Sequence, residues 1–164
     1  MINKKYLYNL MASNAISTIG DSIYYLALIA MATGFSDYSF KIVLVTISEL
    51  FPYIFSFVFG ILADKFYNKQ RIMIICDLIR FSLYSSIALV LLGTSLTNVV
   101  FYFIILCNFF SDCLGNLKSI LYINTIQELS LEEEVGRFIA YNTSINRTLT
   151  IIFHFFWCIR YTYS

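Results

Sequence analysis

Five ionisable residues lie inside long apolar stretches of the chain: Asp21, Glu49, Asp77, Arg80 and Asp112. A charge at the centre of a membrane helix costs about 2.5–3.5 kcal/mol on insertion scales, so such residues usually have a function or a partner. Buried carboxylates without a partner take up protons, and an arginine can hold a carboxylate. We therefore expect these five residues to contact substrate or couple transport to protons. The alternative is that they only tie helices together.

Each of the five residues belongs to a stripe of polar side chains. Steps of three, four and seven residues place each stripe on one helix face. Lipid does not solvate such a face, so the stripes are expected to face one another or a water-filled cavity. The stripes are Asn14, Ser17, Thr18, Asp21 and Tyr25; Glu49, Tyr53, Ser56, Gly60 and Asp64; Asp77, Arg80 and Tyr84; and Asn108, Ser111, Asp112, Gly115 and Ser119.

The spacing of Asp77 and Arg80 predicts an ion pair on one helix face, because they are three residues apart. Arg80 would then lie about 13 Å inside the membrane, at 1.5 Å per residue from the preceding basic segment. Four acids face one arginine, so one or more of Asp21, Glu49 and Asp112 is expected to take up a proton.

The composition places the chain in a membrane. Hydrophobic residues make up 59% of the 164 residues and charged residues 13%, whereas soluble domains have about 45–50% and about 25%. This excludes a soluble enzyme, a disulfide scaffold and a nucleic-acid binder. The four cysteines form no CxxC pair, and no HExxH or GxSxG motif is present. We expect no enzyme activity, no metal and no cofactor.

A single all-helical transmembrane domain is predicted over residues 1–164. A span needs about 20 apolar residues. Five stretches meet this need, the last one weakly, and the segment 123–139 is expected to be a cytoplasmic link holding a short amphipathic helix. The predicted spans are 8–33, 40–63, 72–92, 98–122 and 140–159.

Positive charges predict the orientation of these spans. Lys4 and Lys5 precede the first span, basic residues fill the link between the second and third, and Lys118 and Arg137 flank the fourth. The opposite side has only Lys41 and Arg160. By the positive-inside rule, the N-terminus should be cytoplasmic.

One link carries a recognisable motif, which reads GILADKFYNKQR over residues 60–71. It resembles the G-x-L-a-D-r-x-g-r-k signature between the second and third helices of the major facilitator superfamily. Gly60 would allow close helix packing. Asp64, at a helix C-terminus, would need a partner such as Arg71 or the start of the next helix. The resemblance implies a conformational latch built from Gly60, Asp64, Lys65, Lys69 and Arg71, although Tyr67 stands where glycine is usual.

Three further segments resemble the macrolide-efflux-like branch of drug exporters: STIGDSIYYLAL from Ser17, ELFP from Glu49 and CDLIR from Cys76. The resemblance implies that Asp21, Asp77 and Arg80 line the interior of an N-terminal half. Family members have about twelve helices in two halves. About five are expected here, which implies a truncated exporter that is inactive alone.

The expected function is therefore transmembrane transport. The intact relative would be a proton-coupled antiporter of small hydrophobic compounds in a bacterial plasma membrane. One alternative is a small transporter that completes its pore by self-association. Another is a non-transporting accessory or immunity protein.

Overall fold

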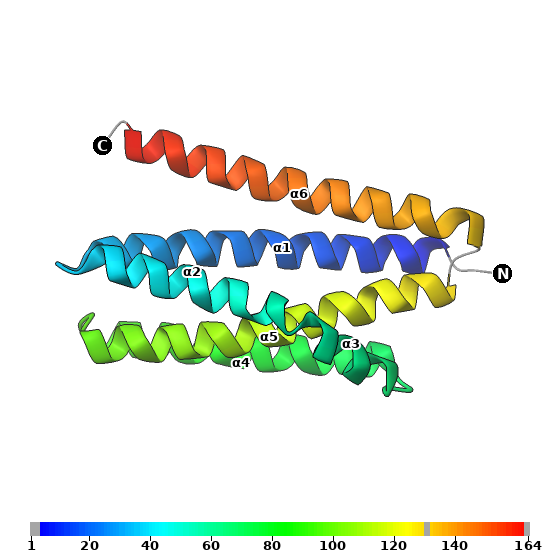
Figure 1. Ribbon diagram of the computed structural model, residues 1–164, viewed down its shortest axis with the longest axis horizontal. Coiled ribbons are helices and arrows are strands. Elements are labelled where there is room, and N and C mark those ends of the chain that lie inside the picture. The colour runs from blue at the N-terminus through cyan, green and yellow to red at the C-terminus, as the bar shows by residue number, and fades with distance from the viewer. Residues whose placement is uncertain (1–3, 130–131, 163–164) are drawn as a thin grey trace. The chain divides into compact units, whose positions relative to one another are not determined.

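The computed structural model describes residues 4–129 and 132–162, and over these residues every regular element is a helix (Figure 1). The long apolar segments of the chain explain why it is helical. In lipid, a single segment can satisfy all its backbone hydrogen-bonding groups only as a helix. The helices are α1 (Lys4–Thr33), α2 (Tyr38–Ile54), α3 (Ser56–Asp64), α4 (Lys69–Gly93), α5 (Asn98–Leu129) and α6 (Glu132–Thr162).

Three of these helices are long and apolar enough to cross a membrane: α1, α4 and α5. The pair α2–α3 makes a fourth if it is counted as one bent span. The fifth predicted span, 140–159, lies within α6, which does not meet this criterion in the described part of the chain. The first half of α6 is too polar for this criterion. Its polar side chains are Arg137, Asn142, Asn146 and Arg147.

The chain divides into two compact units, of which the first contains residues 1–31 and 126–164. Within it, α1 and α6 are joined by side-chain hydrogen bonds. The Asn14 amide donates to the Asn142 side chain at 3.1 Å, and the Thr18 hydroxyl donates to the Asn146 side chain at 3.2 Å. Both bonds join residues 128 positions apart, so the two helices run in the same direction.

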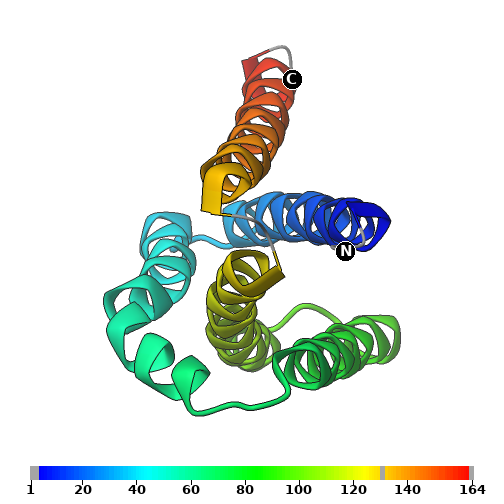
Figure 2. The ribbon, with the colours of Figure 1, turned by 90° about the vertical axis from the view of Figure 1, so that its right-hand side faces the viewer.

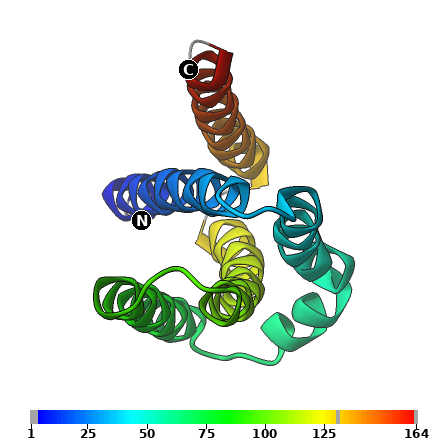
Figure 3. The same ribbon diagram turned by 90° about the vertical axis from the view of Figure 1, so that its left-hand side faces the viewer.

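The second unit contains residues 32–125, and α5 lies at its centre. Figures 2 and 3 look along the helices and show α5 between α2–α3 on one side and α4 on the other. Three hydrogen bonds between α5 and α2–α3 join residues 60 positions apart: Asn108 with Ser48, Asn116 with Ser56, and Asn124 with Asp64. This constant offset means that α5 and α2–α3 run parallel.

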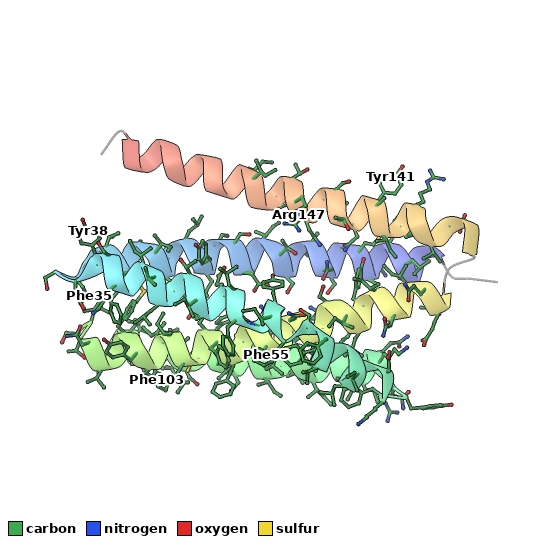
Figure 4. The ribbon with its side chains drawn as sticks, in the orientation of Figure 1. Phe35, Tyr38, Phe55, Phe103, Tyr141 and Arg147 are labelled. Atoms are coloured by element: carbon green, nitrogen blue, oxygen red, sulfur yellow. The ribbon has the colours of Figure 1, made fainter. Side chains whose placement is uncertain are left out.

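The second predicted span is broken at Phe55, where α2 and α3 meet at an angle of 44° (Figure 4). Pro52 lies three residues before the break and weakens the last turns of α2, because it has no N–H and its ring clashes with the preceding turn. In a straight helix the Pro52 carbonyl would accept from Ser56. Here it accepts from the Asn116 amide of α5 at 2.9 Å, and the same amide donates to the Ser56 hydroxyl at 3.0 Å. Asn116 therefore replaces the helical bond that the bend removes.

Lys41 is buried at the opposite end of α2 from this bend. Its ammonium donates to both carboxylate oxygens of Asp37 at 2.8 Å. Three aromatic rings surround it, with centroids 4.4 Å away for Phe35, 5.5 Å for Phe101 and 5.6 Å for Tyr102. The cation thereby ties the start of α2 to the start of α5, whereas its sequence position suggested only a flanking charge.

The predicted link 123–139 differs from the structure. Helix α5 continues to Leu129 and α6 begins at Glu132, with residues 130 and 131 outside the described residues. The apolar side chains of this segment explain the longer helix, because Ile126 and Phe138 are buried. Lys4 and Lys5 begin α1, and their side chains are also outside the described part.

Replacing Asn116 by leucine should destabilise the protein by about 1–3 kcal/mol, because the Pro52 carbonyl would lose its buried donor. Equilibrium unfolding in mixed micelles measures this loss. Asn124→Leu is the matched control, since its bond to Asp64 is exposed and longer, at 3.3 Å. Equal losses for the two variants would contradict the special role of Asn116.

The Asp37–Lys41 pair should make the free energy of unfolding depend on pH in the acid range. The bond from Lys41 holds the pKa of Asp37 below its usual range. Its contribution is therefore complete at neutral pH and is lost as the pH falls below about 4. Thermal unfolding should show that Asp37→Asn is less stable than wild type at pH 7, with the difference shrinking in acid. Lys41→Met should remove the same dependence; if it keeps that dependence, the pair is not its source.

Candidate functional site

A buried cation stands at the centre of the second unit. The Arg80 side chain extends from α4 towards α5 and is only 5% exposed. Its Nε donates to the Ser111 hydroxyl at 3.1 Å, and an Nη donates to the Tyr84 hydroxyl at 3.4 Å. Ser111 in turn donates to Tyr84 at 2.8 Å. We call Arg80, Tyr84 and Ser111 the arginine cluster.

Gly115 makes room for this cluster on α5. A Cβ atom at this position would lie 3.4 Å from Cζ of Arg80, so the guanidinium lies directly against the helix backbone. A larger side chain would occupy the space of the guanidinium. The glycine in the predicted α5 stripe thus has a packing role.

Asn108 organises a second group of polar side chains, one turn from Ser111. Its amide donates to the Ser48 hydroxyl of α2 at 3.2 Å and to the Asp112 carboxylate at 2.7 Å. Asn108 is 1% exposed, while Asp112 is half-buried. Because Asp112 directly follows Ser111 on α5, the carboxylate and the arginine cluster occupy the same level of the helix.

Asp77 pairs with Lys118 of α5, at 2.7 Å, and not with Arg80 as its spacing predicted. The antiparallel course of α4 and α5 explains this: one turn along α4 from Arg80 corresponds to about one turn along α5 from Gly115. The Lys118 side chain is 9% exposed and the Asp77 side chain 46%. Lys118 is therefore a buried, paired residue between α4 and α5, whereas its position suggested only a flanking charge.

The other two predicted acids, Glu49 and Asp21, lie on α2 and α1. Glu49 follows Ser48 on α2 and is half-buried. Asp21 is half-buried on α1, in the first unit. On α5, Asp112 thus directly follows Ser111, the partner of Arg80. On α2, Glu49 directly follows Ser48, the partner of Asn108.

The predicted latch residues lie in the second half of α3, in the link that follows it and in the first turn of α4. The Asp64 carboxylate accepts from Asn124 of α5 at 3.3 Å, and not from Arg71. Lys65 and Arg71 are exposed, and Lys69 begins α4. Within the described residues a Cβ atom at Gly60 would meet nothing within 4 Å, so the close helix packing expected there stays a prediction.

Two residues of the site were missed by sequence reasoning. Lys118 continues the predicted α5 stripe, three residues after Gly115, so its spacing was a usable signal. Asn116 lies outside that stripe and its partner is a backbone carbonyl, which no side-chain pattern reveals. Over the described residues, no group of three or more His, Cys, Asp or Glu could hold a metal ion.

Searches against family models, curated proteins and solved structures found no match to this chain. The polar interior of the second unit is therefore the basis for assigning a function.

The loss of stability on breaking the Asp77–Lys118 pair should depend on which of the two residues is replaced. Asp77→Asn leaves the more buried Lys118 without its counterion and should cost about 1–3 kcal/mol, below the value for a fully buried pair because Asp77 is partly exposed. Lys118→Met should cost less, and the double variant should recover part of the loss. Unfolding in mixed micelles tests this order. Additive losses would show that the pair is not coupled.

Proposed function

We propose that the chain forms part of a membrane exporter of small hydrophobic compounds, of the major facilitator type, driven by protons. The observation that carries this proposal is the buried Arg80 among apolar helices. A cation at this depth is expensive and is not needed for packing alone, which apolar side chains achieve at lower cost. Its hydrogen bonds to Ser111 and Tyr84 hold it at one level of the bundle.

Asp112 is the favoured site of proton coupling within this proposal. Its carboxylate accepts a short bond from Asn108, and the same amide reaches Ser48 of α2. Protonation neutralises the carboxylate and weakens its hold on the Asn108 amide. A proton on Asp112 would thereby loosen or strengthen the contact between α5 and α2, which is the kind of two-state link that transport needs.

Two features favour an exporter of this family over other membrane proteins. One is the resemblance of residues 60–71 to the major facilitator signature. The other is the contact of Asp64 with Asn124, which ties the end of α3 to α5 where that family has its latch. The proposed location is a bacterial plasma membrane with the N-terminus in the cytoplasm, as the positive charges indicate.

A second candidate is a small transporter that works as an oligomer. The exposure of Asp77 favours it, because a carboxylate that is 46% exposed on a membrane helix needs another protein surface or water beside it. A second copy would supply such a surface.

Binding of an uncharged, hydrophobic fluorescent dye to the full chain in nanodiscs tests the proposal. Arg80→Gln should weaken binding about tenfold, which corresponds to about 1.4 kcal/mol. Asp112→Asn should remove the dependence of binding on pH. Arg147→Gln, an exposed arginine of α6, is the matched control and should bind like wild type.

Two results decide between the candidates. Equal binding by wild type, Arg80→Gln and Asp112→Asn would contradict a role for the polar interior. Dye export by the full chain alone in proteoliposomes with a pH gradient, together with a crosslinked dimer, would favour the oligomeric transporter.

A further inference from the structure

A groove lies between the first halves of α1 and α6, within the first unit. Its volume is about 420 Å³, in the usual range for small-molecule sites. Tyr8 and Ala15 line it from α1, and Tyr141 and Ile145 line it from α6. Figure 4 shows Tyr141 near the start of α6, with Arg147 further along the same helix.

Two opposite charges stand at one end of the groove. Arg137 is exposed, and its guanidinium lies 5.6 Å from the ring centroid of Tyr141. The hydrogen bond that Arg137 donates to the Tyr141 hydroxyl raises the pKa of Arg137 further above its usual range, so the cation is permanent. Glu134, one turn earlier on α6, is half-buried and also lines the groove. The mouth therefore presents one positive and one negative group.

The rest of the groove is apolar and is about as long as one acyl chain. From Glu134 to Ile145 the helix rises about 16 Å at 1.5 Å per residue. One acyl chain spans half of the hydrocarbon core of a bilayer, which is about 15 Å. Tyr8 lies towards the charged end, as tyrosines do at membrane interfaces.

We propose that this groove binds a phospholipid with an ammonium headgroup, such as phosphatidylethanolamine. The phosphate lies on Arg137, the ammonium lies beside Glu134, and one acyl chain follows the groove past Ala15 and Ile145. An anionic phospholipid would place its net charge next to Glu134, and an apolar helix would offer no charged group to Arg137. The site requires insertion in a membrane but does not require transport.

Photolabelling in nanodiscs tests this site on the full chain. The probe is phosphatidylethanolamine with a diazirine in its acyl chain, and labelled peptides are identified by mass spectrometry. Labelling should concentrate on residues 8–15 and 138–145, about tenfold above the exposed apolar face at Ile47 and Leu106. Labelling spread evenly over all lipid-facing helices would overturn the proposal.

Two matched pairs of variants sharpen the test. Arg137→Gln should lower labelling of the groove about tenfold, the loss expected for a charge-assisted hydrogen bond, while Arg147→Gln should not. Ala15→Phe should fill the groove and block labelling, while Ala27→Phe, exposed on α1 outside the groove, should not. If Ala15→Phe fails to fold, as shown by circular dichroism, the arginine pair decides.

The headgroup is tested with a phosphatidylglycerol probe carrying the same diazirine chain. It should label the groove several-fold less than phosphatidylethanolamine. Equal labelling by the two probes would overturn the assignment of the ammonium to Glu134. Equal labelling of Arg137→Gln and Arg147→Gln would overturn the site as a whole. Dye binding is measured in parallel. A failure of the exporter proposal can then be told apart from a failure of the lipid site.

Discussion

The packing of the second unit depends on the hydrogen bonds of the buried Arg80 guanidinium. Arg80 enters the bundle from α4, and it donates hydrogen bonds to the Ser111 hydroxyl of α5 and the Tyr84 hydroxyl of α4. The guanidinium lies against the α5 backbone at Gly115, where a Cβ atom would be 3.4 Å from its Cζ. Because an unsatisfied guanidinium in this setting would be very costly, Arg80 favours the pairing of α4 with α5 and a small residue at position 115.

Much of the helical arrangement follows from the sequence. The thickness of a bilayer sets the length of each apolar segment, and lipid excludes polar side chains, so these gather in stripes on one helix face. Four of the five predicted spans correspond to α1, α2–α3, α4 and α5. The division of the second span at Phe55 does not follow so directly. Pro52 indicates a kink, but whether a helix bends or breaks depends on a partner for the freed carbonyl, and that partner is Asn116 on another helix.

The sequence predicts which residues belong to the site, but it does not predict which of them pair with one another. The stripes identified Arg80, Ser111 and Asp112, which share one level of the bundle. Spacing within one helix suggested Asp77 as the partner of Arg80, whereas the register of α4 against α5 brings Lys118 to Asp77. A pairing between helices depends on how far one is shifted along the other, and this shift is set by packing rather than by either sequence alone.

The constant offset of 60 positions between α5 and α2–α3 has a consequence for the tolerance of the chain to insertions and deletions. Three polar contacts at Asn108, Asn116 and Asn124 share this offset over four turns of α5. Apolar side chains in lipid slide past one another at little cost, so these amides are what defines the alignment. Adding or removing one residue between Asn108 and Asn124 would rotate the remaining amides by about 100°. Helix length in this stretch is therefore more constrained than the identity of its lipid-facing residues.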